Sequence, residues 1–125
     1  MEMDGQVASS ANSGYNIARM RYEIVLSPEA VDDLNGLRAH LRATVRDALE
    51  QHLRNEPTRT TKSRIKRLRG LRRPQFRLRV GDDVRVFYDV REGESTVEIL
   101  GIVSKSEADA WLEKAGESDE GNRPV

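Results

Sequence analysis

The sequence lacks cysteine altogether and has few residues of the kinds that bind metals. With no Cys among its 125 residues, the chain can form neither a disulfide nor a thiolate metal site. Its two histidines, His40 and His52, are too few for a His-rich site. We therefore expect no metal centre, and the lack of cysteine agrees with a reducing compartment.

Long hydrophobic runs are also missing. No apolar stretch approaches the roughly 20 residues that a membrane helix requires, and the N-terminal sequence MEMDGQVASSANSGYNIAR lacks the apolar segment of a signal peptide. Hydrophobic residues make up 37% of the chain, which is enough for one modest core in a single domain. We expect a soluble, cytoplasmic protein with no membrane partner.

The charge is balanced overall but concentrated in one segment. The chain has 21 basic and 21 acidic residues, yet Arg59–Arg79 contains ten Lys or Arg and no acid. Because fields decay within about 8–10 Å at physiological salt, a nucleic acid would respond to this segment and not to the average. Two other interpretations stay open, a solvated surface and a docking site for an acidic partner segment.

Short turns and alternating residues predict strands on either side of a helical region. A strand is expected at Arg21–Leu26, followed by Ser27 as an N-cap and Pro28 at the first helical position. The apolar spacing then favours two helices folded as a hairpin over one long kinked helix. We expect these helices at about 28–37 and 40–54.

The second half of the chain reads as a meander of strands and a final helix. The connector 58–74 allows a short helical turn at 62–68, before Gly70 and Pro74 break it. Short turns separate the predicted strands 76–80, 84–90 and 96–103, so the strands should be antiparallel. Ser104–Glu107 has the form of a capping box for the last helix. The predicted class is α+β, a small, mostly antiparallel sheet packed against a helical hairpin, in the order β-α-α-β-β-β-α.

Alternation sorts the side chains of the predicted hairpin. Phe76, Leu78 and Val80 should face the core, and Arg77 and Arg79 the other side. On the returning strand Tyr88 falls on the core face. Phe87 falls on the arginine side, where it would stack on a base, or pack under the connector or against a partner protein. Asp82 and Asp83 are turn residues, and Trp111 is a packing anchor.

The predicted domain occupies residues 20–114. Residues 1–19 are rich in Ser, Asn and Gly and are expected to form a flexible tail, as are residues 115–125. Met20 immediately precedes the first predicted strand and is a candidate start codon.

Several motifs together resemble the RelE/ParE superfamily of type II toxin–antitoxin toxins, with the RelE side closer. They are YEIVLSPEAVDDL, the RLRG after the helical hairpin, FRLRVGDDVRVFYDV and VEILGIVSKSEA. The resemblance covers about residues 20–112. It implies a small toxin inhibited by a cognate antitoxin and needing no metal or organic cofactor. RelE-like members cleave mRNA, typically on the ribosome, whereas ParE-like members inhibit DNA gyrase.

The resemblance also implies roles for individual residues. Arg77, Arg79 and Arg85 would be the catalytic residues, holding the scissile phosphate and stabilising charge while the 2′-hydroxyl attacks. Arginine is a poor base, and Asp109 stands where many members carry a tyrosine. The expected RNA- and phosphate-binding residues are Lys62, Lys66, Arg69, Arg72, Arg73, Phe87 and Lys105.

Three functional hypotheses follow from these residues. The leading one is an mRNA interferase, a metal-independent endoribonuclease that stops translation and growth, with antitoxin and ribosome-bound mRNA as its partners. The alternative is a ParE-like gyrase inhibitor, or a catalytically weakened toxin that acts by protein binding. The third is a RelE-fold protein without toxicity.

Overall fold

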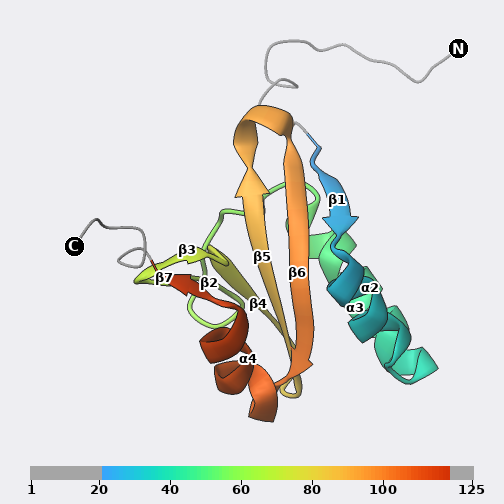
Figure 1. Ribbon diagram of the computed structural model, residues 1–125. Helices are drawn as coiled ribbons and strands as arrows, with labels where there is room; N and C mark the ends of the chain where they lie inside the picture. Colours follow the sequence, from blue (N-terminus) through green and yellow to red (C-terminus); the bar gives the residue numbers. More distant parts are fainter. Residues whose placement is uncertain (1–20, 119–125) are drawn as a thin grey trace, which may run out of the picture.

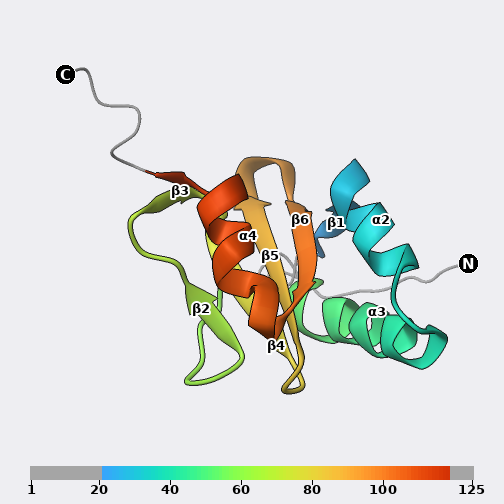
Figure 2. The same ribbon diagram turned by 60° about the horizontal axis from the view of Figure 1, so that its bottom comes forward.

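The computed structural model describes residues 21–118 as a five-stranded sheet with helices on both faces (Figure 1). The strand order is β1-β6-β5-β4-β2, and β3 pairs with β7 in a separate two-stranded sheet. Figure 2 shows the main sheet between α4 on one side and α2 and α3 on the other. In chain order the elements are β1 (Glu23–Leu26), α2 (Pro28–Asn35), α3 (Ala39–Leu53), β2 (Ile65–Arg67), β3 (Leu71–Arg73), β4 (Phe76–Val80), β5 (Val84–Arg91), η1 (Glu92–Glu94), β6 (Thr96–Ser104), η2 (Lys105–Glu107), α4 (Ala108–Ala115) and β7 (Glu117–Ser118).

The helical hairpin forms as the sequence predicts. Ser27 caps α2, since its hydroxyl accepts a hydrogen bond from the Ala30 amide at 3.1 Å and Pro28 follows it. Gly36 ends α2, and the guanidinium of Arg42 donates to the Leu37 carbonyl at 2.9 Å. The predicted helices 28–37 and 40–54 are therefore confirmed to within about two residues, as is the break between them.

The predicted antiparallel meander is also confirmed. β4, β5 and β6 pair in sequence, and the β4–β5 turn contains Gly81 with a φ of 59°, which favours glycine. A register shift interrupts the β5–β6 ladder between Phe87 and Tyr88. β1 then adds to the outer edge of β6 in parallel, which short-range turn signals alone do not indicate.

The core lies between the sheet and the helical hairpin. Val45, Leu49 and Leu53 of α3 are buried in the same cluster as strand residues such as Leu78 and Ile99. Tyr88 is fully buried there, as predicted, and its hydroxyl donates to the Pro57 carbonyl at 2.7 Å. That bond satisfies the one polar group that Tyr88 takes into the core.

The connector and the last helix differ from the sequence-based expectation. The predicted helical turn at 62–68 is wrong, because Ile65–Arg67 forms β2 and pairs with the open edge of β4. The capping-box prediction is wrong as well. Ser104 makes no capping hydrogen bond, a 3₁₀ turn occupies Lys105–Glu107, and α4 begins at Ala108.

The two predicted tails have different outcomes. Residues 1–19 lie outside the described part of the chain. At the other end, Ala115 is the last residue of α4 and Glu117–Ser118 forms β7 against β3, so ordered structure extends into the predicted tail 115–125. No helix within residues 21–118 is long and apolar enough to cross a membrane.

Candidate nucleic-acid interface and partner groove

Three arginines meet on the face of the sheet that is opposite the helical hairpin. Arg77 and Arg79 lie on β4 and Arg85 on β5, and their register sets Arg79 directly opposite Arg85. Directly opposite side chains in an antiparallel pair have Cβ atoms about 5 Å apart, where like charges repel. We call these three residues the arginine cluster. The sequence predicted the common face of Arg77 and Arg79, and the register adds Arg85 beside them.

Arg77 is the member of the arginine cluster with an unmet hydrogen-bond donor. Its Nε is buried without a partner among the described residues, and its Nη2 donates to the Ser63 carbonyl at a long 3.4 Å. Burial lowers the pKa of Arg77 below its ordinary value, and the charges of Arg85 and Arg79 lower it further. An anion bound beside these guanidinium groups would relieve the repulsion.

The β4–β5 turn holds the other two arginines. Arg79 donates from Nε to the Gly81 carbonyl at 3.0 Å and from Nη2 to the Asp82 carboxylate at 2.5 Å. Arg85 is only 8% exposed, and its Nη1 donates to the carbonyls of Asp82 at 3.2 Å and Val84 at 3.0 Å. The turn thus fixes both guanidinium groups. As predicted, Asp82 is a turn residue, but it is also the counterion of Arg79.

A surface hollow of about 310 Å³ adjoins the arginine cluster. Its lining includes Arg64, which precedes β2 and accepts a hydrogen bond on its carbonyl from the Arg79 amide at 2.7 Å. Sequence reasoning missed Arg64, because only the pairing of β2 with β4 shows which connector residues lie beside the arginines. The hollow is lined by Ser63, Arg64, Arg79, Gly81 and Asp82.

Some of the predicted phosphate-binding residues are free to bind a ligand. Lys62, Lys66 and Arg69 are exposed on the connector, and Lys66 pairs directly opposite Arg77. Lys105 is exposed in η2, where its amide donates to the Asp83 carbonyl at 2.7 Å. The backbone of Lys105 is therefore hydrogen-bonded to the turn that holds Arg79 and Arg85. These four residues keep their roles as candidates around the arginine cluster.

Arg72 and Arg73 are engaged elsewhere. Arg72 forms an ion pair with Glu117 that joins β3 to β7. Arg73 donates from Nε to buried Asp89 at 2.7 Å and from Nη2 to Glu98 at 3.3 Å. Both arginines were predicted to bind phosphate, and in the structure each is paired with carboxylates. Their observed contacts are structural, and phosphate binding by either one stays a prediction.

Phe87 is fully buried beneath α4. Its ring stacks on Trp111 with centroids 4.8 Å apart and an interplanar angle of 5°. The Trp111 indole can lie this close to the sheet because Gly101, opposite Phe87 on β6, has no side chain. This burial contradicts the predicted RNA-stacking role of Phe87, since the indole occupies that surface. The prediction that Trp111 anchors the last helix is confirmed.

Histidine does not supply a proton acceptor to the arginine cluster. His52 lies on α3 and lines a separate hollow with Arg59 and Arg64. Burial lowers the pKa of His52, and the charge of Arg64 lowers it further. Within residues 21–118 no three His, Cys, Asp or Glu side chains gather as they would to hold a metal ion.

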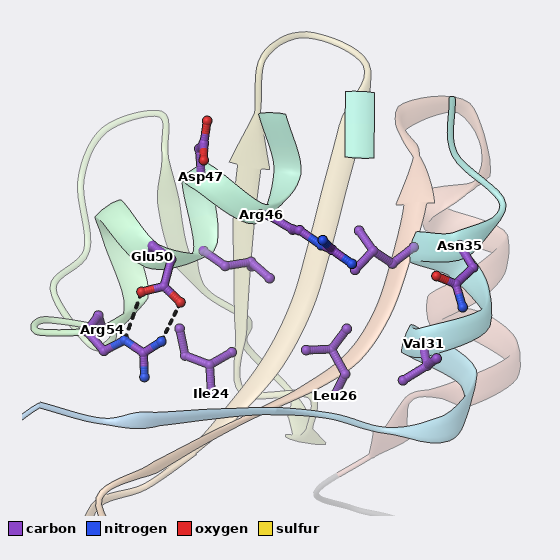
Figure 3. Close-up of a pocket in the computed structure, with 10 residues that line it drawn as sticks. Ile24, Leu26, Val31, Asn35, Arg46, Asp47, Glu50 and Arg54 are labelled. Atoms are coloured by element: carbon purple, nitrogen blue, oxygen red, sulfur yellow. Dashed lines mark hydrogen bonds and ion pairs between the residues drawn. The ribbon is translucent and has the colours of Figure 1, made fainter. Parts of the chain in front are cut away.

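A second surface feature is an apolar groove on the helical face, with a volume of about 540 Å³ (Figure 3). Ile24 and Leu26 of β1 contribute to it from one side, and Val31 of α2 is 41% exposed within it. The rim is polar and includes the ion pair of Arg54 with Glu50. The lining consists of Ile24, Leu26, Val31, Leu34, Asn35, Arg46, Asp47, Leu49, Glu50 and Arg54.

One family model matches most of the described chain. It is described as the ParE toxin of type II toxin–antitoxin system, parDE, and it matches residues 24–109. The match contains most of β1, the helical hairpin, all three members of the arginine cluster and the beginning of α4. The sequence matches none of the curated proteins compared with it.

Solved structures share the fold. The toxin–antitoxin complex RelBE2 from Mycobacterium tuberculosis matches with 25% identity and a TM-score of 0.57, covering 70% of this chain and 94% of that chain. The archaeal RelE–RelB complex from Pyrococcus horikoshii OT3 matches with 27% identity and a TM-score of 0.52, covering 69% and 97%. A mutant of the E. coli toxin RelE in the free state matches with 23% identity and a TM-score of 0.57, covering 77% and 95%.

Proposed function

The chain belongs to the ParE toxin family of type II toxin–antitoxin systems, within the RelE/ParE superfamily, and we propose that this toxin is a RelE-like mRNA interferase. Its place of action would be the cytoplasm, on translated mRNA at the ribosome. The observation that carries the proposal is the arginine cluster, with a buried guanidinium donor that no residue of the described chain satisfies.

The chemistry that fits the arginine cluster is charge stabilisation. As the 2′-hydroxyl attacks the adjacent phosphate, negative charge grows on the phosphate oxygens until the 5′-oxygen leaves. Arg77 would contribute its positive charge, and Arg79 and Arg85 would add two further guanidinium groups held by the turn. Guanidinium groups donate two hydrogen bonds side by side to phosphate oxygens, which suits this task.

The arginine cluster is less suited to moving protons. Lowered as it is, the pKa of Arg77 belongs to a guanidinium, which keeps its proton in proteins. Asp109, at the family's tyrosine position, lies in the first turn of α4. Cleavage by this toxin would therefore depend on the ribosome or on the substrate for proton transfer, and we expect ribosome-free RNA to be cut poorly.

Cleavage in a translating extract tests the proposal. Primer extension on the mRNA should detect cuts within translated codons for the wild type, and Arg77→Gln and Arg85→Gln should each reduce them at least tenfold. Arg38→Gln is the matched control, because Arg38 is exposed at the start of α3, on the other side of the sheet. Thermal melts would establish that the variants fold. Equal cutting by Arg77→Gln and Arg38→Gln would sink the interferase proposal.

The alternative is a toxin that inhibits DNA gyrase by binding it. Two observations favour this alternative, namely the ParE family match and the absence, within residues 21–118, of a histidine beside the arginine cluster. In that case induced cells would accumulate gyrase-dependent DNA breaks, and their mRNA would stay intact. Measuring both in the same culture separates the two functions.

An antitoxin is the partner we propose for the apolar groove. Both solved complexes named above contain a RelB antitoxin with the toxin, and an amphipathic helix is a common ligand for a groove with an apolar floor and a charged rim. We expect the occupant to be a helix of the antitoxin with its apolar side toward Ile24, Leu26 and Val31.

Two equally exposed valines provide the test of the groove. Val31 and Val25 are each 41% exposed, but only Val31 lines the groove. Val31→Lys should weaken the complex with the co-expressed antitoxin by tenfold or more, whereas Val25→Lys should leave it nearly unchanged. Isothermal titration with purified antitoxin measures both. Equal losses for the two variants would place the antitoxin elsewhere.

A further inference from the structure

Asp82 is the one carboxylate with an ion pair to the arginine cluster among the described residues. Its Oδ1 accepts from Arg79 Nη2 at 2.5 Å, and the same guanidinium donates from Nε to the Gly81 carbonyl at 3.0 Å. The Asp82 side chain is 83% exposed and that of Arg79 is 39% exposed. The pair therefore lies at the surface, where an external anion can reach it.

The neighbouring hollow is where that anion would compete. Arg64, Arg79 and Asp82 line it together, and its volume of about 310 Å³ is sufficient for a phosphate group. A phosphate there would compete with the Asp82 carboxylate for Nη2 of Arg79, and at the other donors of this guanidinium it would meet the negative charge of Asp82. Asp83, the next residue, is exposed and forms no ion pair with residues 21–118.

We propose that Asp82 is an internal anion that occupies the phosphate-binding position on Arg79 and thereby weakens the binding of single-stranded RNA. The inference rests on the proposed function for its substrate, RNA, but its contact is with any phosphate. Asp82 acts through Arg79 and is a positioning residue, not a catalytic one. It makes RNA affinity lower than the charge of three arginines would give alone.

Two isosteric variants separate this role from a general change of charge. Asp82→Asn and Asp83→Asn each remove one negative charge from the same turn, and only the first breaks the ion pair with Arg79. In fluorescence anisotropy with a labelled single-stranded RNA oligonucleotide, Asp82→Asn should tighten binding about two- to five-fold, as expected for loss of an exposed ion pair. Asp83→Asn should change the affinity much less.

A double variant tests whether the effect passes through Arg79. In the Arg79→Gln background, adding Asp82→Asn should give no tightening, because the guanidinium that the carboxylate masks is gone. Tightening that persists in this background, or equal tightening by Asp83→Asn, would overturn the inference. So would loss of cleavage by Asp82→Asn at unchanged RNA affinity, since Asp82 would then be a proton acceptor.

A titration with inorganic phosphate keeps this inference separate from the proposed function. The Nε–H resonance of Arg79 in a ¹H–¹⁵N spectrum should shift at lower phosphate concentration in Asp82→Asn than in the wild type. If the wild type bound no RNA while this difference appeared, the RNA proposal would fail and the masking of Arg79 would stand. Identical phosphate titrations of the two proteins would refute the masking.

Discussion

Gly101 is the residue that lets α4 pack against the sheet. A Cβ atom built at Gly101 would lie 2.5 Å from ring carbons of Trp111, and the indole is held in place by stacking on Phe87. Overpacking of this kind costs about 1–3 kcal/mol. Gly101→Ala should therefore lower the free energy of unfolding by about that amount in urea denaturation.

The control for Gly101→Ala removes the ring that it meets. In a Trp111→Ala background the added methyl group has room, so the penalty of Gly101→Ala should shrink to a few tenths of a kcal/mol. A penalty of the same size in both backgrounds would show that the strain lies in the backbone and not against Trp111.

Tyr88 couples stability to high pH. Burial raises the pKa of the Tyr88 phenol above its ordinary value of 10.0, so the unfolded chain loses this proton at lower pH than the folded chain. The contribution to stability is complete below about pH 10 and declines as the pH rises above that value. Urea titrations between pH 8 and pH 11 should show a declining free energy of unfolding.

The variant Tyr88→Phe isolates this contribution. It should cost about 1 kcal/mol at pH 7, because the Pro57 carbonyl loses its hydrogen bond. Its stability should then fall less steeply above pH 10 than that of the wild type. Parallel declines for the two proteins would assign the pH dependence to other groups.

At the scale of elements, Asp33 connects α2 to the part of β6 that lies beyond its pairing with β1. Its Oδ2 accepts from the Ile102 amide at 3.0 Å, past Ile99, where the β1–β6 ladder ends. Asp33→Ala would leave a part-buried amide unsatisfied, at a cost of about 1–3 kcal/mol. Chemical denaturation measures this loss.

Asp32 provides the matched control for that loss. It is the preceding residue on α2, is exposed, and makes no side-chain hydrogen bond to the described residues. Asp32→Ala should change the free energy of unfolding by less than about 0.5 kcal/mol. Similar losses for Asp32→Ala and Asp33→Ala would point to a general effect of charge on α2.

Elements with local signals could be predicted from the sequence, and elements that depend on distant partners could not. Ser27 with Pro28, and the alternation around Gly81, are local and gave α2 and the β4–β5 hairpin correctly. β2 forms because β4 offers an open edge, and the segment Lys62–Leu68 itself contains nothing that excludes a helical turn. The same limit applies to β7, which needs β3.

The candidate site shows the same division. Alternation placed Arg77 and Arg79 on one face, and this held in the structure. Alternation does not show which of the basic side chains are paired with a carboxylate. Arg73 meets Asp89 and Glu98, whereas Arg77 meets no acid, and neither contact can be read from spacing. The prediction that Phe87 would stack on RNA was wrong because α4, from a later part of the chain, covers its ring.

For the whole molecule, charge separation matters more than net charge. The chain is formally neutral, yet it gathers the arginine cluster on one face. RNA binding should therefore weaken as salt rises, with a slope of log K against log salt of about −0.7 for each phosphate that is neutralised. In anisotropy titrations over a range of salt, Arg77→Gln should make this slope less negative by about 0.7. Arg38→Gln should leave the slope unchanged.

Equal slopes for the wild type and Arg77→Gln would show that Arg77 neutralises no phosphate. Any contribution of Arg77 to RNA affinity would then come from hydrogen bonds or stacking. Arg38→Gln guards against a general effect, since it removes the same formal charge from the opposite side of the sheet.

The parallel pairing of β1 with β6 has a consequence for how the chain folds. The meander β4–β5–β6 closes through short loops, whereas Glu23 reaches Thr96 only after nearly the whole described chain has been made. Contacts so distant in sequence close late and slow the folding reaction. Until β1 docks, β6 presents an unpaired edge, and this edge is where incompletely folded chains would join one another.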